Sequence, residues 1–231
     1  MNKIFITWLG LSVVCVCVGA WLFFSSSQSA KLDTDTQAAT PQAAAITIIA
    51  FGDSLTAGYG VQLSEAYPAQ LERALREQGY DVSVINSGVS GETTRGNVER
   101  ASFIRAQNPD IVILGTGGND ALRSFPVENT RDNITATVDI LLDGEQAPQV
   151  FLLKMQAPLN AGETYKQNFD SIYEEIANRK NLVLVPFLTE SIFFDESNKL
   201  PDGIHYNGQG YQKVIETHLL PAVIDELEES L

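Results

Sequence analysis

The chain has 231 residues, of which 44% are hydrophobic, 29 are acidic and 15 are basic, so that its formal net charge is −14 at pH 7. This acidic balance argues against binding to nucleic acid or to anionic lipid surfaces, because their phosphate groups would be repelled. The length fits a single domain with a sizeable core once a distinct N-terminal segment is set aside.

Residues 4–24 carry no charge and are apolar apart from Thr7 and Ser12. As a helix, this segment would span about 30 Å of hydrocarbon, the thickness of a membrane core. Because Lys3 precedes it, the N-terminus is expected to stay in the cytoplasm and the rest of the chain to lie outside. We therefore expect residues 1–24 to be either a transmembrane anchor or a signal peptide removed near residues 25–30.

Residues 25–45 are rich in Ser, Gln, Ala and Thr and lack apolar periodicity, which predicts a disordered linker. Residues 46–231 then form the single expected domain. Both cysteines, Cys15 and Cys17, belong to the apolar N-terminal segment. The domain therefore contains no cysteine and needs no disulfide even in an oxidising compartment.

Within residues 46–231, short apolar runs alternate with helical patterns. Strands are expected at residues 46–51, 82–86, 111–115, 150–155 and 182–186, and helices near residues 65–78, 93–107, 129–143, 164–180 and 208–227. Short apolar strands separated by helices predict an α/β fold, here a three-layer α/β/α sandwich around a parallel five-stranded sheet.

Ser54 directly follows the first strand in a Gly-Asp-Ser-Leu segment, and Asp202 and His205 stand three residues apart before the last helix. A serine hydroxyl, an imidazole that takes its proton and a carboxylate that orients the imidazole are what nucleophilic acyl transfer requires. The second histidine, His218, has the setting of an ordinary helix residue, which leaves His205 as the candidate base. Taken alone, the Gly-Asp-Ser segment is equally compatible with a turn or a helix cap.

Gly-rich turns follow the second and third strands. Gly88 would let a backbone N–H approach a substrate oxygen closely, and Asn119 carries a side-chain amide donor. Because the carboxyl ends of parallel strands gather at one edge, both groups are expected beside Ser54, where they would form an oxyanion hole. Taken singly, a tight turn at Gly88 and an Asx turn at Asn119 are the alternatives.

The sequence lacks the motifs of several other enzyme classes. No serine stands in Gly-x-Ser-x-Gly, there is no P-loop, and two isolated histidines give no zinc-ligand spacing. The segment from Gly115 begins like a dinucleotide fingerprint, but its sixth position is Asp120 where a small residue is needed. We therefore expect neither a metal nor a cofactor.

Together, the Gly-Asp-Ser-Leu, Gly, Gly-x-Asn-Asp and Asp-x-x-His segments resemble the SGNH (GDSL) hydrolase family. They occur in the family's order, and the segments around Ser54 and Asn119 are similar to the bacterial thioesterase I, lysophospholipase L1 and arylesterase branch. The resemblance implies a flavodoxin-like sandwich and a triad of Ser54, Asp202 and His205. It also implies an oxyanion hole formed by the Ser54 and Gly88 N–H groups and the Asn119 side chain.

The same resemblance implies a serine esterase that hydrolyses acyl esters, and thioesters or lysophospholipids, through an acyl-enzyme. It would act in the periplasm, either tethered to the inner membrane or exported after signal cleavage. Two alternatives remain open: a carbohydrate O-acetylesterase and a non-catalytic envelope-binding module. We expect an acyl ester or lipid substrate, no nucleic-acid partner and a monomer.

Two details of the site remain open. The loops around Tyr59 and at residues 122–126 and 159–165 are candidates for lining an acyl pocket, with loop packing as the alternative. Tyr206 stands where related bacterial enzymes often have proline, and we expect it to alter the rim of the site.

Overall fold

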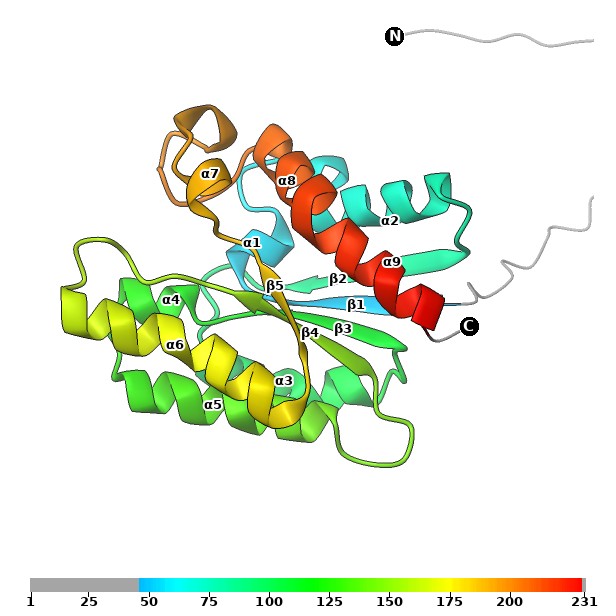
Figure 1. Ribbon diagram of the computed structural model, residues 1–231, viewed down its shortest axis with the longest axis horizontal. Coiled ribbons are helices and arrows are strands. Elements are labelled where there is room, and N and C mark those ends of the chain that lie inside the picture. Colours follow the sequence, from blue (N-terminus) through cyan, green and yellow to red (C-terminus); the bar gives the residue numbers. More distant parts are fainter. Residues whose placement is uncertain (1–45, 230–231) are drawn as a thin grey trace, which may run out of the picture. The chain divides into compact units, whose positions relative to one another are not determined.

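The computed structural model describes residues 46–229, and the predicted N-terminal anchor and linker lie outside them. The described residues contain a five-stranded sheet of order β2-β1-β3-β4-β5 in which every neighbouring pair is parallel (Figure 1). The strands are β1 (Ile46–Gly52), β2 (Val82–Gly88), β3 (Ile111–Gly115), β4 (Gln149–Lys154) and β5 (Val183–Pro186). The predicted fold class is confirmed, and all five strands lie within two residues of their expected positions.

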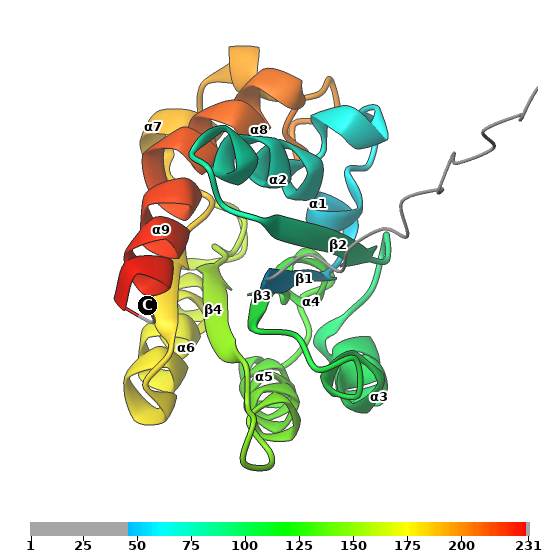
Figure 2. The same ribbon diagram turned by 90° about the vertical axis from the view of Figure 1, so that its right-hand side faces the viewer.

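Helices cover both faces of the sheet, which gives the three predicted layers (Figure 2). One face carries α2 (Tyr67–Glu77), α8 (Gly208–Val214) and α9 (Leu220–Glu229), and the other carries α3 (Thr94–Arg105), α5 (Val127–Leu141) and α6 (Glu163–Lys180). Because both faces are covered, the central strand β3 is buried along its whole length. This explains why its sequence is continuously apolar and does not alternate.

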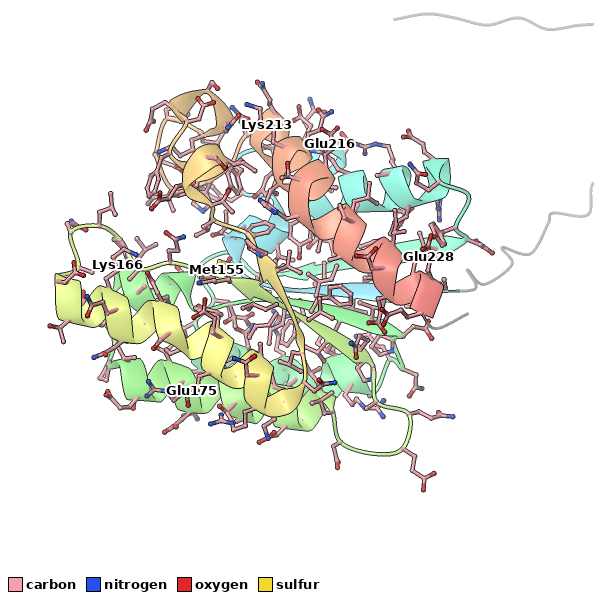
Figure 3. The ribbon with its side chains drawn as sticks, in the orientation of Figure 1. Met155, Lys166, Glu175, Lys213, Glu216 and Glu228 are labelled. Carbon is pink, nitrogen blue, oxygen red and sulfur yellow. The ribbon has the colours of Figure 1, made fainter. Side chains whose placement is uncertain are left out.

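Side chains follow the same division between interior and surface. Met155, directly after β4, is fully buried, whereas Glu175, Glu216 and Glu228 on the surrounding helices are exposed to solvent (Figure 3). Among the described residues, no helix is both long enough and apolar enough to cross a membrane.

The last predicted helix, residues 208–227, is interrupted in the structure. A π-helical turn, η3 (Ile215–Leu219), separates α8 from α9, and the backbone N–H of Leu220 donates to the carbonyl of Ile215, five residues earlier. Pro221 explains the interruption, since it has no backbone N–H and its ring clashes with the carbonyl of the preceding turn. The apolar pattern of residues 208–227 predicted one continuous helix, and the structure divides it at this proline.

Short helices at the carboxyl edge of the sheet were not predicted. They are α1 (Ser54–Ala57), α4 (Gly118–Leu122), α7 (Glu190–Phe193), and the 3₁₀ turns η1 (Leu63–Glu65) and η2 (Glu196–Asn198). Each is too short to show a hydrophobic period in sequence. This edge nevertheless holds most of the functional groups predicted from sequence.

Candidate active site

A row of glycines at the carboxyl ends of three neighbouring strands brings α1 close to the sheet. Gly52 is paired in register with Gly88 on one side and with Gly115 on the other. A Cβ atom on Gly88 would lie 2.1 Å from the backbone nitrogen of Ala57, and one on Gly52 would lie 2.2 Å from the Gly115 carbonyl oxygen. Only glycine leaves room for this approach, which places Ser54 directly above the sheet edge.

The start of α1 is fixed by its neighbours in the sequence. The Asp53 side chain caps the helix by accepting a hydrogen bond from the Leu55 N–H at 3.0 Å. Gly58, with φ of 77°, ends it in the left-handed conformation. Tyr211 of α8 donates its hydroxyl to the Leu55 carbonyl at 2.8 Å. These contacts fix the position of Ser54, the first residue of α1.

Ser54, His205 and Asp202 form a continuous hydrogen-bonded chain. The Ser54 Oγ lies 2.8 Å from the His205 Nε2, although the two residues are 151 positions apart in the sequence. The His205 Nδ1 lies 2.7 Å from the Asp202 Oδ2. This order of hydroxyl, imidazole and carboxylate is the one in which an imidazole can remove the hydroxyl proton.

Asp202 is held in place by the loop that carries it. Its Oδ1 accepts hydrogen bonds from the Ile204 N–H at 2.9 Å and the His205 N–H at 3.0 Å. Burial acts to raise the pKa of Asp202, but these two N–H groups and the His205 side chain outweigh it and lower the pKa below its usual value. The carboxylate therefore stays ionised at neutral pH and faces the imidazole.

The three predicted oxyanion-hole donors all lie around α1, and two are already engaged. The Gly88 N–H donates to the side-chain oxygen of Asn86 at 3.0 Å, and the Asn119 amide donates to the Asp53 Oδ2 at 3.3 Å. Ser54 is the first residue of its helix, and the first N–H groups of a helix have no partner within it. An incoming oxygen would therefore compete with Asn86 for the Gly88 N–H.

Asp53 was not singled out from the sequence beyond its capping role. It is 2% exposed, and burial raises its pKa to about 6, against the opposing effects of the Leu55 N–H and the Asn119 amide. The sequence signal that could have identified Asp53 as a site residue was its position beside the serine in the Gly-Asp-Ser segment. The structure gives this carboxyl a second contact, to the side chain of Asn119.

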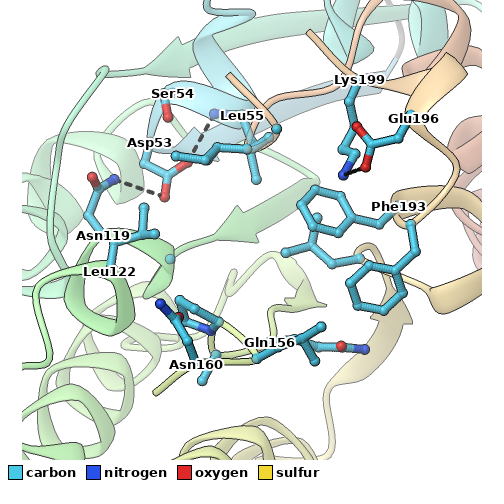
Figure 4. Close-up of a pocket in the computed structure, with 18 residues that line it drawn as sticks. Asp53, Ser54, Leu55, Asn119, Leu122, Gln156, Asn160, Phe193, Glu196 and Lys199 are labelled. Atoms are coloured by element: carbon cyan, nitrogen blue, oxygen red, sulfur yellow. Dashed lines mark hydrogen bonds and ion pairs between the residues drawn. The ribbon is translucent and has the colours of Figure 1, made fainter. Parts of the chain in front are cut away.

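A pocket of about 450 Å³ opens beside Ser54 and Asn119 (Figure 4). Leu122 and Leu159, from two of the loops proposed above, are among its lining residues. Other lining residues follow β5 and were not predicted, namely Leu188, Phe193, Phe194, Lys199 and Ile204. They come from a segment without apolar periodicity, so only the folded chain reveals them as neighbours of the serine.

Two aromatic residues that the sequence singled out, Tyr59 and Tyr206, do not line the pocket. The Tyr59 ring packs against the His205 ring, with 4.7 Å between centroids. Tyr206, expected at the rim, is fully buried, packs against Phe187 and donates its hydroxyl to the Phe187 carbonyl at 2.8 Å. Tyr206 therefore belongs to the buried core directly after His205 in the chain.

No group of three or more histidine, cysteine, aspartate or glutamate side chains within residues 46–229 is arranged to hold a metal ion.

Comparison with known proteins places this geometry in a family. The GDSL-like lipase/acylhydrolase family model matches residues 50–213, which include Ser54, Gly88, Asn119, Asp202, His205 and all the residues that line the pocket. The chain belongs to the GDSL-like lipase/acylhydrolase family.

Relatives of this GDSL-family chain are ester hydrolases by name. An arylesterase of Vibrio mimicus is 33% identical over 159 residues, which cover 68% of this chain and 78% of the relative. The thioesterase 1/protease 1/lysophospholipase L1 of Escherichia coli is 33% identical over 167 residues, covering 71% and 77% of the two chains.

A solved structure agrees with the fold. The psychrotrophic esterase EstA from Pseudoalteromonas sp., inhibited by monoethylphosphonate, superposes with a TM-score of 0.70 at 28% identity, covering 79% of this chain and 97% of that one. The resemblance inferred from the four sequence segments is thereby confirmed.

Proposed function

We propose that this GDSL-family protein is a serine esterase in which Ser54 is the nucleophile, His205 the general base and Asp202 the orienting carboxylate. The observation that carries the proposal is the hydrogen-bonded chain from Ser54 Oγ through both His205 nitrogens to Asp202. Family membership and the ester-hydrolase names of the relatives support the reaction class.

The proposed reaction proceeds through an acyl-enzyme. The Ser54 Oγ attacks the ester carbonyl carbon while His205 Nε2 takes the hydroxyl proton, and Asp202 stabilises the resulting imidazolium. The Ser54 N–H, the Gly88 N–H and the Asn119 amide donate hydrogen bonds to the oxyanion. His205 then gives its proton to the leaving alkoxide, and a water molecule activated by His205 hydrolyses the acyl-enzyme.

We propose acyl esters with an apolar acyl group as the substrate class, with thioesters and lysophospholipids among the candidates. The pocket beside Ser54 is lined by leucine, phenylalanine and isoleucine side chains, which favour an acyl chain longer than acetate. A carbohydrate O-acetylesterase would not need such a wall, and a binding module would not need the hydrogen-bonded triad.

Hydrolysis of p-nitrophenyl esters from acetate to palmitate tests this proposal. Ser54→Ala should reduce kcat by at least about 10⁴-fold with the fold retained. Ser102→Ala is the matched control, since Ser102 is exposed on α3. A phosphonate ester should add one covalent group to the wild-type protein and none to Ser54→Ala, as measured by intact mass.

Each outcome of the ester series has a distinct meaning. Turnover that peaks on medium or long chains supports the proposal. Turnover of acetate alone would replace it with a deacetylase, and the absence of turnover and of phosphonate labelling in folded protein would favour the binding module.

We further propose that residues 1–24 anchor or export the chain, residues 25–45 link them to the catalytic domain of residues 46–231, and the enzyme acts as a monomer in the periplasm. The uncharged apolar run behind Lys3 supports the first part. Immunoblots of membrane and soluble fractions, with intact mass of each, test cleavage, and light scattering tests the monomer. A cytoplasmic, full-length soluble protein would contradict the proposed location.

A further inference from the structure

The pocket beside Ser54 contains a buried cation. Lys199 lines the pocket, and its side chain is only 7% exposed, which is rare for lysine unless the charge is paired. Its Nζ lies 2.8 Å from the Oε1 of Glu196, and 5.1 Å from the centroid of the Phe193 ring. Glu196 also lines the pocket, and its side chain is 82% exposed.

This ion pair faces the serine across the pocket. Figure 4 shows Ser54, Asp53 and Asn119 on one side, Phe193, Glu196 and Lys199 on the opposite side, and Leu55 between them. Apolar side chains thus separate the reacting end of the pocket from a charged end. The backbone of Lys199 is held by a bridge to Tyr206, next to His205, so the charged end has a fixed place relative to the triad.

A charged end affects an acyl chain in a predictable way. Each methylene that moves from water onto the apolar wall should strengthen transition-state binding by about fourfold. A chain long enough to reach this ion pair would instead remove water from the exposed Glu196 carboxylate and bring methylenes against the Lys199 charge, which is costly for charged groups. The gain from chain length should therefore stop where the ion pair begins.

We propose that Lys199, held by Glu196 and Phe193, ends the apolar part of the pocket and sets the upper limit on acyl-chain length. This inference rests on the proposed esterase function, because it assigns the acyl group to the same pocket. It makes the substrate an ester whose acyl group is uncharged and of limited length, and it names Lys199 as a specificity-determining residue.

The test is kcat/KM of the full-length protein for monomeric p-nitrophenyl esters with even-numbered acyl chains from butyrate upward. Lys199→Met keeps an apolar stem and removes the charge, so the preferred chain should lengthen by at least two methylenes. The ratio of kcat/KM for the ester two methylenes beyond the wild-type optimum to that for butyrate should rise about tenfold or more.

Glu196→Gln provides a second variant with the opposite prediction. It leaves the lysine charge without its ionic partner, so approach of a long chain becomes costlier and the same ratio should fall. Because the Glu196 side chain is exposed, this variant should keep its fold, which circular dichroism checks. Lys180→Met is the matched control, because Lys180 pairs with Asp139 and does not line the pocket, and its ratio should equal that of wild type.

Opposite shifts in the two pocket variants support the inference. An unchanged ratio in an active Lys199→Met enzyme, or a rise of the ratio in both pocket variants, overturns the inference while leaving the esterase proposal standing. If the wild-type protein shows no hydrolysis that depends on Ser54, both the inference and the esterase proposal are overturned.

Discussion

At the scale of single residues, the carboxyl groups next to Ser54 and His205 lie in environments that shift their pKa values in opposite directions. Asp202 lies on a loop where N–H groups stabilise its charge and lower its pKa, whereas burial raises the pKa of Asp53 to about 6. Asp202 is suited to remain an anion next to His205. Asp53, with its pKa of about 6, should gain or lose its proton at pH values where the folded protein can be measured.

Replacing Asp53 with asparagine should alter the pH dependence of stability. Because the folded-state pKa of about 6 lies above the ordinary value of 3.8, the stability associated with Asp53 is fully present below about pH 4 and is lost as the pH rises through 6. The difference corresponds to about 3 kcal/mol. Relative to wild type, Asp53→Asn should therefore gain about 3 kcal/mol in unfolding free energy between pH 4 and pH 8.

Urea denaturation at the two pH values measures this change. Parallel stability curves for wild type and Asp53→Asn would show that Asp53 does not titrate as its burial indicates. Asp132→Asn is a suitable control, since it changes the same chemical group on the partly solvent-exposed helix α5.

Asp202→Asn should affect the rate far more than the fold. An asparagine retains the size of the side chain but cannot stabilise the imidazolium or hold its tautomer, so kcat for the best ester should fall by about 10³- to 10⁴-fold. Thermal unfolding and kcat, measured on the same preparation, separate the two effects. A loss smaller than tenfold would remove Asp202 from the proposed triad.

At the scale of elements, the site depends on how closely a helix of four residues, α1, approaches two strand ends. Gly52 and Gly88 leave no space for a Cβ atom under α1, and at Gly88 the nearest atoms are backbone. Backbone cannot rotate away as a side chain can. The sequence of these glycines therefore controls where Ser54 stands.

Gly88→Ala should both destabilise the protein and reduce its activity. The new Cβ would meet the Ala57 nitrogen at 2.1 Å, so β2 and α1 must move apart, at a cost of about 1–3 kcal/mol or more. Gly79→Ala is the control: its φ of 94° is strained for alanine, but no atom lies within 4 Å of the new Cβ. Chemical denaturation should show a larger loss for Gly88→Ala, and only that variant should lose kcat/KM.

Gly88 has no positive φ, so an equal loss of stability in the two glycine variants would mean that the close approach of α1 does not require glycine at position 88.

At the scale of the whole molecule, the proposed reaction needs only groups that the domain itself carries. The sequence from residue 46 onward has no cysteine, and its described part has no cluster of metal-binding side chains. Hydrolysis by the full-length protein should therefore be unchanged by EDTA and by a thiol reductant, as measured by initial rates. A loss on chelation that added metal restores would contradict the metal-free mechanism.

Much of the architecture could be predicted from the sequence because each strand carries its own signal. A continuous apolar run such as Ile111–Gly115 has to be buried on both faces, and helices between such runs impose parallel pairing. The triad and oxyanion-hole candidates could be named because serine, histidine, aspartate and asparagine stand in short segments directly after strands or before a helix. These features are local, so they can be recognised in the sequence without knowledge of the fold.

Tertiary structure alone decided the features that depend on distant segments meeting. The 2.8 Å contact between Ser54 and His205, the raised pKa of Asp53 and the burial of Tyr206 each require neighbours far away in the chain. The charged end of the pocket is a further case, because Lys199 and Phe193 belong to a segment without periodicity and come to line the same pocket as the serine only when the chain folds. The amino-acid sequence by itself determined the sheet, its layers and the chemical groups at its edge. The distances between these groups, their burial and the shape of the pocket were decided by packing, because they depend on atoms that come together only when the chain folds.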